Sequence, residues 1–172
     1  MNRYWQISLA VLLAFSSGCH QYPSVKPETK NVAGVYQPNP ETLAMFAKQG
    51  YTQTNNISVI LQADGKFELR NMPDAWLSSL RSVDAPQNAY DSGSGKWTIN
   101  DNGTDGNVAW GVMFEFENTT NIVSIKKQMK AILVVGGNVL KNEKAPYLLD
   151  FFIGGSDSGP LCEFHVSPKV QK

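Results

Sequence analysis

The stretch N-I-S-V-I-L-Q-A-D-G-K-F-E-L-R-N-M-P-D-A-W-L, residues 56–77, decides the fold. Two apolar runs flank Asp64-Gly65, a dipeptide that accepts the positive φ angles of tight turns. The stretch therefore predicts a β-hairpin.

The returning strand of this hairpin alternates apolar and polar side chains. Phe67 and Leu69 are apolar, and the residues between and beside them are charged, namely Lys66, Glu68 and Arg70. Because successive side chains of a strand point to opposite faces, one face is buried and the other is exposed. Met72-Pro73-Asp74 is expected to end the pairing, since proline cannot donate to a ladder. The remaining strands must cover the apolar face.

Length and charge limit the classes of protein to be considered. The chain has 172 residues, of which 42% are hydrophobic, enough for one domain with its own core. The formal net charge is zero, and basic residues do not gather into a patch. Nucleic acid is therefore an unexpected partner.

The N-terminus has the pattern of a signal peptide, residues 1–18. Arg3 supplies a positive charge, residues 7–15 form an apolar run too short to span a bilayer, and Ser16-Ser17-Gly18 is a small-residue cleavage site. Cys19 follows directly.

The segment L-A-F-S-S-G-C, ending at Cys19, resembles the lipobox of bacterial lipoproteins, although Ser16 stands where leucine is commonest. The resemblance implies that Cys19 is lipidated, with palmitate among its acyl chains, and is the first mature residue. His20 replaces the aspartate that in this family implies inner-membrane retention, so an outer-membrane lipoprotein facing the periplasm or the cell surface is expected. Several acyl chains would anchor the protein stably. The alternative is an ordinary cleaved signal with an incidental cysteine.

The mature chain is expected to divide into a tether and one domain. Residues 19–30 contain the cysteine, Pro23 and Pro27 and lack periodicity, which is typical of a tether of a few tens of ångströms. Residues 31–172 form the domain. Its one cysteine, Cys162, lies among apolar residues and is interpreted as a small buried hydrophobe rather than a reactive thiol.

One helix is predicted at 40–49. Asn39 is its N-cap, Pro40 its first residue and Gly50 its end, with an apolar stripe of Leu43, Phe46 and Ala47. A second short helix is predicted at 73–80.

The other segments predict short strands. They begin with 33–36; after a long loop at 82–95 follow 95–99 and 107–116, the latter with Val108, Trp110, Val112, Phe114 and Phe116 at every second position. Four more are expected at 122–127, 130–135, 147–153 and 161–166. This spacing is typical of an antiparallel meander.

The predicted fold class is mainly β: a meander of eight or nine strands closing into a barrel, with one N-terminal helix. Closure removes exposed strand edges. The organisation resembles that of the lipocalin-like superfamily. The motif Gly93-x-Gly95-x-Trp97 and the turn from Ile153 to Gly159 also look like uncharacterised Gram-negative envelope proteins, a likeness that implies no activity.

Two motifs suggest chemistry but lack necessary partners. The segment at Ser158 is similar to the nucleophile segment of chymotrypsin-like proteases, but neither His20 nor His165 stands where the base is needed. A calcium loop starting at Asp101 would need glutamate at its twelfth position, which is Val112. Histidine and cysteine are too few for a zinc or copper cluster. We expect no cofactor, no metal and no catalytic residue.

An apolar ligand at the barrel mouth is the first functional hypothesis, for a non-enzymatic, lipid-anchored module. The mouth is placed at residues 72–76, and the candidate ligand-binding residues are Trp76, Met72, Trp97, Trp110 and Phe114. Ordinary core packing is the alternative for these side chains.

Two other functions stay open. In the second, loops 82–95 and 100–107 bind or inhibit a protein partner, since loops on a rigid scaffold often carry function. In the third, the protein is a hydrolase that uses carboxylates such as Asp74 and Asp150, although no paired constellation is visible. The sequence does not indicate an oligomeric state.

Overall fold

The predicted hairpin forms in the structure, a computed structural model that describes residues 22–74, 89–101, 109–120, 128–135, 146–152 and 161–167. Its strands are β2 (Ser58–Leu61) and β3 (Lys66–Pro73), and Leu61 pairs with Phe67 next to the turn. Gly65 has a φ of 84°, and the Asp64 carboxylate accepts a hydrogen bond from the Lys66 N–H at 3.1 Å. Phe67 and Leu69 are buried and Lys66 and Arg70 are exposed, so the predicted faces are confirmed.

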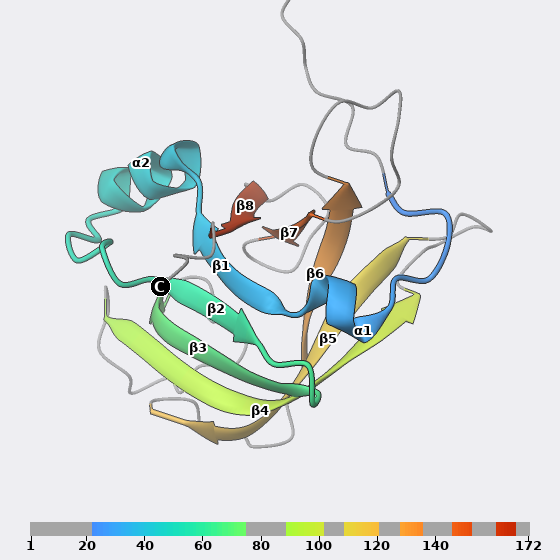
Figure 1. The fold of residues 1–172 in the computed structure, drawn as a ribbon. Coiled ribbons are helices and arrows are strands. Elements are labelled where there is room, and N and C mark those ends of the chain that lie inside the picture. The colour runs from blue at the N-terminus through green and yellow to red at the C-terminus, as the bar shows by residue number, and fades with distance from the viewer. Residues whose placement is uncertain are drawn as a thin grey trace, which may run out of the picture.

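Eight strands close into an antiparallel barrel in which each strand pairs with its neighbours in the sequence, and β8 returns to β1 (Figure 1). The fold class is confirmed. The remaining elements are α1 (Thr29–Val32), β1 (Gly34–Pro38), α2 (Pro40–Lys48), β4 (Tyr90–Asp101), β5 (Trp110–Thr119), β6 (Gln128–Val135), β7 (Tyr147–Phe152) and β8 (Leu161–Val166).

Strand β3 ends within Met72-Pro73-Asp74, as expected, but Met72 and Pro73 themselves are still paired. Met72 pairs with Asp91 and Pro73 with Tyr90, and the N–H of Asp74 donates to the Ala89 carbonyl at 2.9 Å. Because successive N–H groups point to opposite sides of a strand, the Pro73 nitrogen faces β2, whose pairing with β3 has already ended at Arg70. Proline therefore costs the ladder no hydrogen bond at this position.

The predicted loop at 82–95 is wrong from Tyr90 onward, because β4 begins there instead of at Gly95. Gly93 and Gly95 allow β5 to approach β4 closely where the pairing of these two strands is irregular; they do not form a turn. A Cβ at Gly93 would lie 2.9 Å from the Phe116 ring, and one at Gly95 would lie 2.0 Å from the Glu115 carbonyl oxygen. The register between β4 and β5 shifts at this point.

The inward face of β5 is predicted correctly, since Val112, Phe114 and Phe116 are buried. Trp110, which the alternation also places on this face, is the first residue of β5 and is only partly buried. The longest strand is β4, with 12 residues. The strand predicted at 122–127, most of the helix predicted at 73–80 and the protease-like segment at Ser158 lie outside the described residues.

Helix α2 is capped as predicted: the Asn39 side chain accepts a hydrogen bond from the Thr42 N–H at 2.8 Å. The helix packs beside β8 and the end of β1 (Figure 1). Phe46 is buried and Leu43 partly so, but Ala47 is exposed, contrary to prediction, because the buried positions are Thr42 and Phe46. The Thr42 hydroxyl donates a hydrogen bond to the Glu163 carbonyl and accepts one from the Glu163 N–H. These two bonds turn the face of α2 that carries Thr42 and Phe46 toward β8.

The described part of the predicted tether, residues 22–30, is mostly exposed but contacts the domain at two positions. Pro23 and Pro27 are buried, and α1 begins at Thr29. Val32 in α1 is fully buried, and its carbonyl accepts a hydrogen bond from the Tyr36 hydroxyl at 2.6 Å. The contact between Val32 and Tyr36 spans four residues of the sequence.

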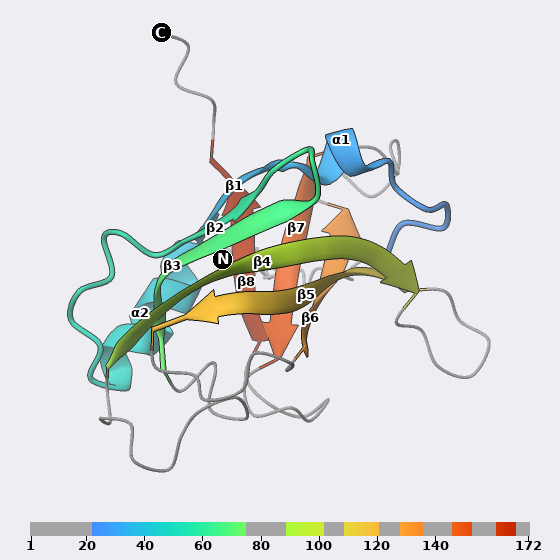
Figure 2. The same cartoon turned by 90° about the horizontal axis from the view of Figure 1, so that it is seen from below.

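The barrel has two distinguishable ends, which Figure 2 shows from a second direction. The α2 end is the one where β1 ends and α2 lies. The hairpin end is the one with the β2–β3 turn, residues 62–65, and there α1 and the N-terminal segment, residues 22–28, pass over the barrel.

Candidate functional site

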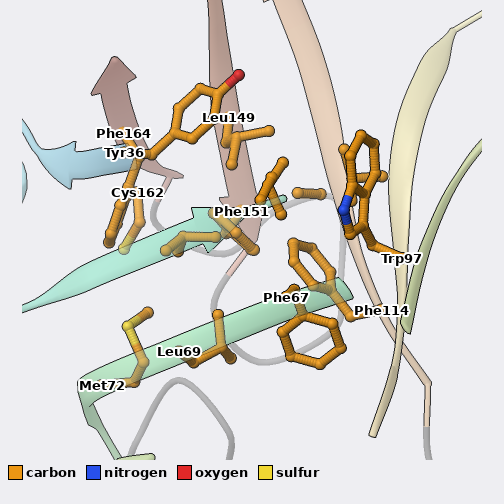
Figure 3. Packing of buried hydrophobic residues seen from close by; sticks show 14 of the residues in the cluster. Tyr36, Phe67, Leu69, Met72, Trp97, Phe114, Leu149, Phe151, Cys162 and Phe164 are labelled. Atoms are coloured by element: carbon orange, nitrogen blue, oxygen red, sulfur yellow. The ribbon is translucent and has the colours of Figure 1, made fainter. Parts of the chain in front are cut away.

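Aromatic side chains fill the middle of the barrel (Figure 3). Phe67 lies between Phe114 and Phe116, with ring centroids 5.0 and 5.2 Å apart, and both contacts are edge-to-face. Phe151 continues the cluster at 5.9 Å from Phe114 and 5.6 Å from Phe164. These rings are at most 2% exposed, and they occupy the space that a ligand inside the barrel would need.

The predicted ligand-binding residues do not form one pocket. Met72 is fully buried near the α2 end, whereas Trp97 and Trp110 lie near the hairpin end. Phe114 pairs with Trp97 and belongs to the aromatic cluster between the two ends. Trp76 lies outside the described residues.

The α2 end contains polar groups beneath its surface. The hydroxyl of Tyr51 donates to the Asp74 carboxylate, and the Tyr51 ring packs edge-on against Tyr90 with centroids 5.7 Å apart. The Asp91 carboxylate accepts a hydrogen bond from the Thr120 hydroxyl at 3.3 Å. Asp74 and Asp91 are each 1% exposed, so they tie chain connections to the barrel rather than face solvent.

Sequence reasoning missed Tyr51, Tyr90 and Asp91. The available signal was weak: Asp91 is in phase with Gly93, Gly95 and Trp97, the inward positions of β4. That signal becomes visible only if the strand is known to begin at Tyr90.

An open groove of about 490 Å³ lies at the hairpin end, between the N-terminal segment, the β2–β3 turn and β4. Trp97 borders it and is 3% exposed; its indole N–H donates to the Gln62 carbonyl at 2.9 Å. The Lys26 ammonium comes from the N-terminal segment and lies 5.6 Å from the centre of the Trp110 ring. A second open groove, of about 320 Å³, follows the outer face of β3, β4 and β5 and is lined mostly by polar residues.

The carboxylates of the hydrolase alternative are not brought together. Asp74 follows β3 and Asp150 lies on β7, four strands away in a ring of eight, and thus across the barrel. Leu149 and Phe151 point into the core, so Asp150 between them lies on the other face of the strand. Within the described ranges, no three His, Cys, Asp or Glu side chains are grouped to hold a metal ion.

Cys162 is buried, as predicted. Burial, and secondarily the charge of Asp150, raises the pKa of the Cys162 thiol to about 12. A thiol is a weak nucleophile while it remains protonated, so this cysteine is unsuited to catalysis at neutral pH.

The two loops of the protein-partner hypothesis are joined to opposite ends of β4. Residues 90–95 and 100–101 of the predicted loops are part of this strand, and the rest of the first loop precedes Tyr90 while the rest of the second follows Asp101. A strand of this length extends over about 36 Å, so the two segments are attached at opposite ends of the barrel. The Asp101 carboxylate accepts a hydrogen bond from the Ala109 N–H at 3.1 Å.

Cys19 lies outside the described residues, and no helix in the described part of the chain is long and apolar enough to cross a membrane. No protein-family model matches the chain, and neither a curated protein nor a solved structure matches it.

Proposed function

We propose that the protein is a non-enzymatic binding module of the bacterial cell envelope, anchored in the outer membrane by acyl chains on Cys19. The support for the anchor is the positive Arg3, the apolar run at 7–15 and the small residues before the cysteine. The module faces the periplasm or the cell surface.

The packed interior carries the second part of the proposal, which is that binding takes place on the outside of the barrel. Phe67, Phe114 and Phe151 occupy the middle of the barrel, and an apolar ligand there would have to displace them. Removing such a side chain from a well-packed core typically costs about 3–5 kcal/mol. The geometry therefore favours a protein partner over a ligand enclosed in the barrel.

The α2 end is the better surface for that partner. Its connections are residues 39–57, 74–89, 120–127 and 153–160, whereas the hairpin end has the shorter set 62–65, 102–109 and 136–146. Long connections on a rigid scaffold supply most binding surfaces of such folds. The hydrogen bonds of Tyr51 with Asp74 and of Asn39 with Glu163 fix the bases of these connections.

The anchor is tested by metabolic labelling with a palmitate analogue and by membrane fractionation. The wild-type protein should take up label and sediment with membranes, and Cys19→Ser should do neither. Cys162→Ser is the matched control and should label like the wild type, because Cys162 is buried in the core. An unlabelled, soluble wild-type protein would exclude the anchor.

The partner surface is tested by placing a photo-crosslinking amino acid at single exposed positions in cells. Lys48 and Thr52 probe the α2 end, and Lys66 is the control at the hairpin end. A discrete crosslinked product is expected from the first two positions only. Equal products from all three, or none, would contradict a partner site at the α2 end.

A small apolar ligand remains a second candidate because of the groove beside Trp97. Fatty acids would then quench tryptophan fluorescence saturably in the wild type, and a Trp97→Phe protein would lose that response. A linear, non-saturating response in both proteins would exclude this candidate.

A further inference from the structure

We infer that the hairpin end of the barrel lies against the membrane, with Tyr22 and Val25 in contact with the lipid surface. This inference rests on the proposed anchor at Cys19 and adds the orientation of the domain.

Only a few residues separate Cys19 from the domain. Pro23 is already buried, and Pro27 and α1 continue the contact. A fully extended chain spans at most about 3.6 Å per residue, so the Cα atom of Cys19 lies within roughly 11 Å of that of Tyr22. Lipid on Cys19 would consequently hold this end of the barrel near the bilayer, whatever path the intervening residues take.

The N-terminal segment is attached to the hairpin end and not to the barrel wall in general. Lys26 lies over the ring of Trp110, the first residue of β5, and also lines the groove beside the β2–β3 turn. Val32 inserts fully into the core just before β1 begins. These contacts fix the N-terminal segment to the hairpin end of the barrel. A lipid on Cys19 would therefore bring the hairpin end toward the membrane.

Exposed apolar side chains gather on the same part of the molecule. Among the described residues, the large hydrophobic side chains that stand out into solvent are Tyr22, Val25 and Val35, with exposed fractions of 41%, 71% and 41%. Tyr22 and Val25 belong to the N-terminal segment, and Val35 is the second residue of β1, at the hairpin end. Tyrosine is favoured at membrane interfaces, because its ring is apolar and its hydroxyl can remain hydrated.

The occupant of this apolar surface is therefore a phospholipid bilayer and not a second protein. A partner protein would have to enter the space of roughly 11 Å that the chain leaves between Tyr22 and the lipidated residue. The α2 end then points away from the membrane, toward the compartment from which a partner arrives.

The experiment uses the full lipidated protein in vesicles of phosphatidylethanolamine and phosphatidylglycerol. An environment-sensitive fluorophore is attached to Val25→Cys or, in the matched variant, to Lys48→Cys at the α2 end; both positions are exposed, and the native Cys162 is buried. Lipids with a nitroxide near the headgroup should quench the fluorophore at position 25 several-fold more than the one at position 48. Equal quenching, or stronger quenching at position 48, would overturn the orientation.

Failure of the anchor gives a different result. If the wild-type protein does not sediment with the vesicles, the lipidation of Cys19 is wrong; if it sediments but both positions are quenched alike, only the orientation is wrong. Inserting about twelve Gly and Ser residues between His20 and Gln21 adds about 20 Å of reach. This variant should remain bound to vesicles while the difference between positions 25 and 48 decreases.

Discussion

Gly95→Ala should lower the free energy of unfolding, because β5 approaches β4 closely at Gly95. The added Cβ would lie 2.0 Å from the Glu115 carbonyl oxygen and 2.9 Å from the Glu117 nitrogen, both of which are backbone atoms. A flexible side chain could move away, but two paired strands cannot do so without breaking their pairing. The substitution therefore forces the strands apart.

The size of that displacement sets the expected cost. Ordinary contacts of a Cβ begin at 3.4 Å, so the strands must separate by about 1.4 Å locally. Adding this distance to a hydrogen bond of about 2.9 Å takes it beyond bonding range. Each lost ladder bond costs about 0.5–1.5 kcal/mol, and overpacking of a core typically costs 1–3 kcal/mol. We expect a loss of about 3 kcal/mol in the free energy of unfolding.

Urea unfolding of a Cys19→Ser protein, followed by tryptophan fluorescence, measures this loss. Gly34→Ala is the matched control, because its added Cβ would meet only side-chain atoms at 3.7 Å. That substitution should leave the stability nearly unchanged, or raise it slightly by restricting the unfolded chain. Equal stability of the two variants would refute the close approach of β5 to Gly95.

Asn39→Ala should lower the free energy of unfolding by about 1–2 kcal/mol, because it removes the cap of α2 and the 2.9 Å hydrogen bond to Glu163. Asn39→Ser keeps a capping oxygen and adds no charge beside Glu163, so it should cost less in the same urea assay. Phe114→Ala should cost about 3–5 kcal/mol and the half-buried Trp110→Ala roughly half as much, so a larger loss at Trp110 would mean that the core is misassigned. Cys162 should react with a thiol reagent at pH 8 only after denaturant is added. Since burial raises its pKa from 9.0 to about 12, the stability due to the neutral thiol is complete below pH 9 and lost toward pH 12, and Cys162→Ala should flatten this alkaline decline.

Local patterns were sufficient to predict much of the fold. The turn at Asp64-Gly65, the alternation through Phe67 and Leu69 and the N-cap at Asn39 each depend on residues within a few positions of one another. Closure of the barrel followed from the number of short strands and the absence of other elements to cover their edges.

The errors come from contacts between distant segments. Gly93 and Gly95 have the composition of a loop, and only Phe116 and Glu115 on the next strand explain why glycine is needed within β4. Pro23 and Pro27 have the composition of a tether, but both are buried. The strand propensity of a residue is an average over many environments, so it cannot predict a contact with one particular distant segment.

The candidate site was harder to predict for the same reason. Tyr51, Asp74 and Asp91 come from three separate segments, and only the register of β3 with β4 brings the last two to one end of the barrel. The predicted residues Met72 and Trp97 are both buried, yet they lie toward opposite ends. Burial was predictable from alternation, but the position along the barrel was not.

The two ends of the barrel have unequal roles if Cys19 carries the lipid. A stable protein interface needs about 800 Å² on each partner, and the roughly 11 Å of chain between Cys19 and Tyr22 leaves no room for such a contact at the hairpin end. The α2 end has the longer connections, and hydrogen bonds from Tyr51 and Asn39 hold their bases in place. Because the aromatic cluster around Phe67 occupies the middle of the barrel, the surface at the α2 end is where we expect this protein to recognise a partner while it remains attached to the membrane.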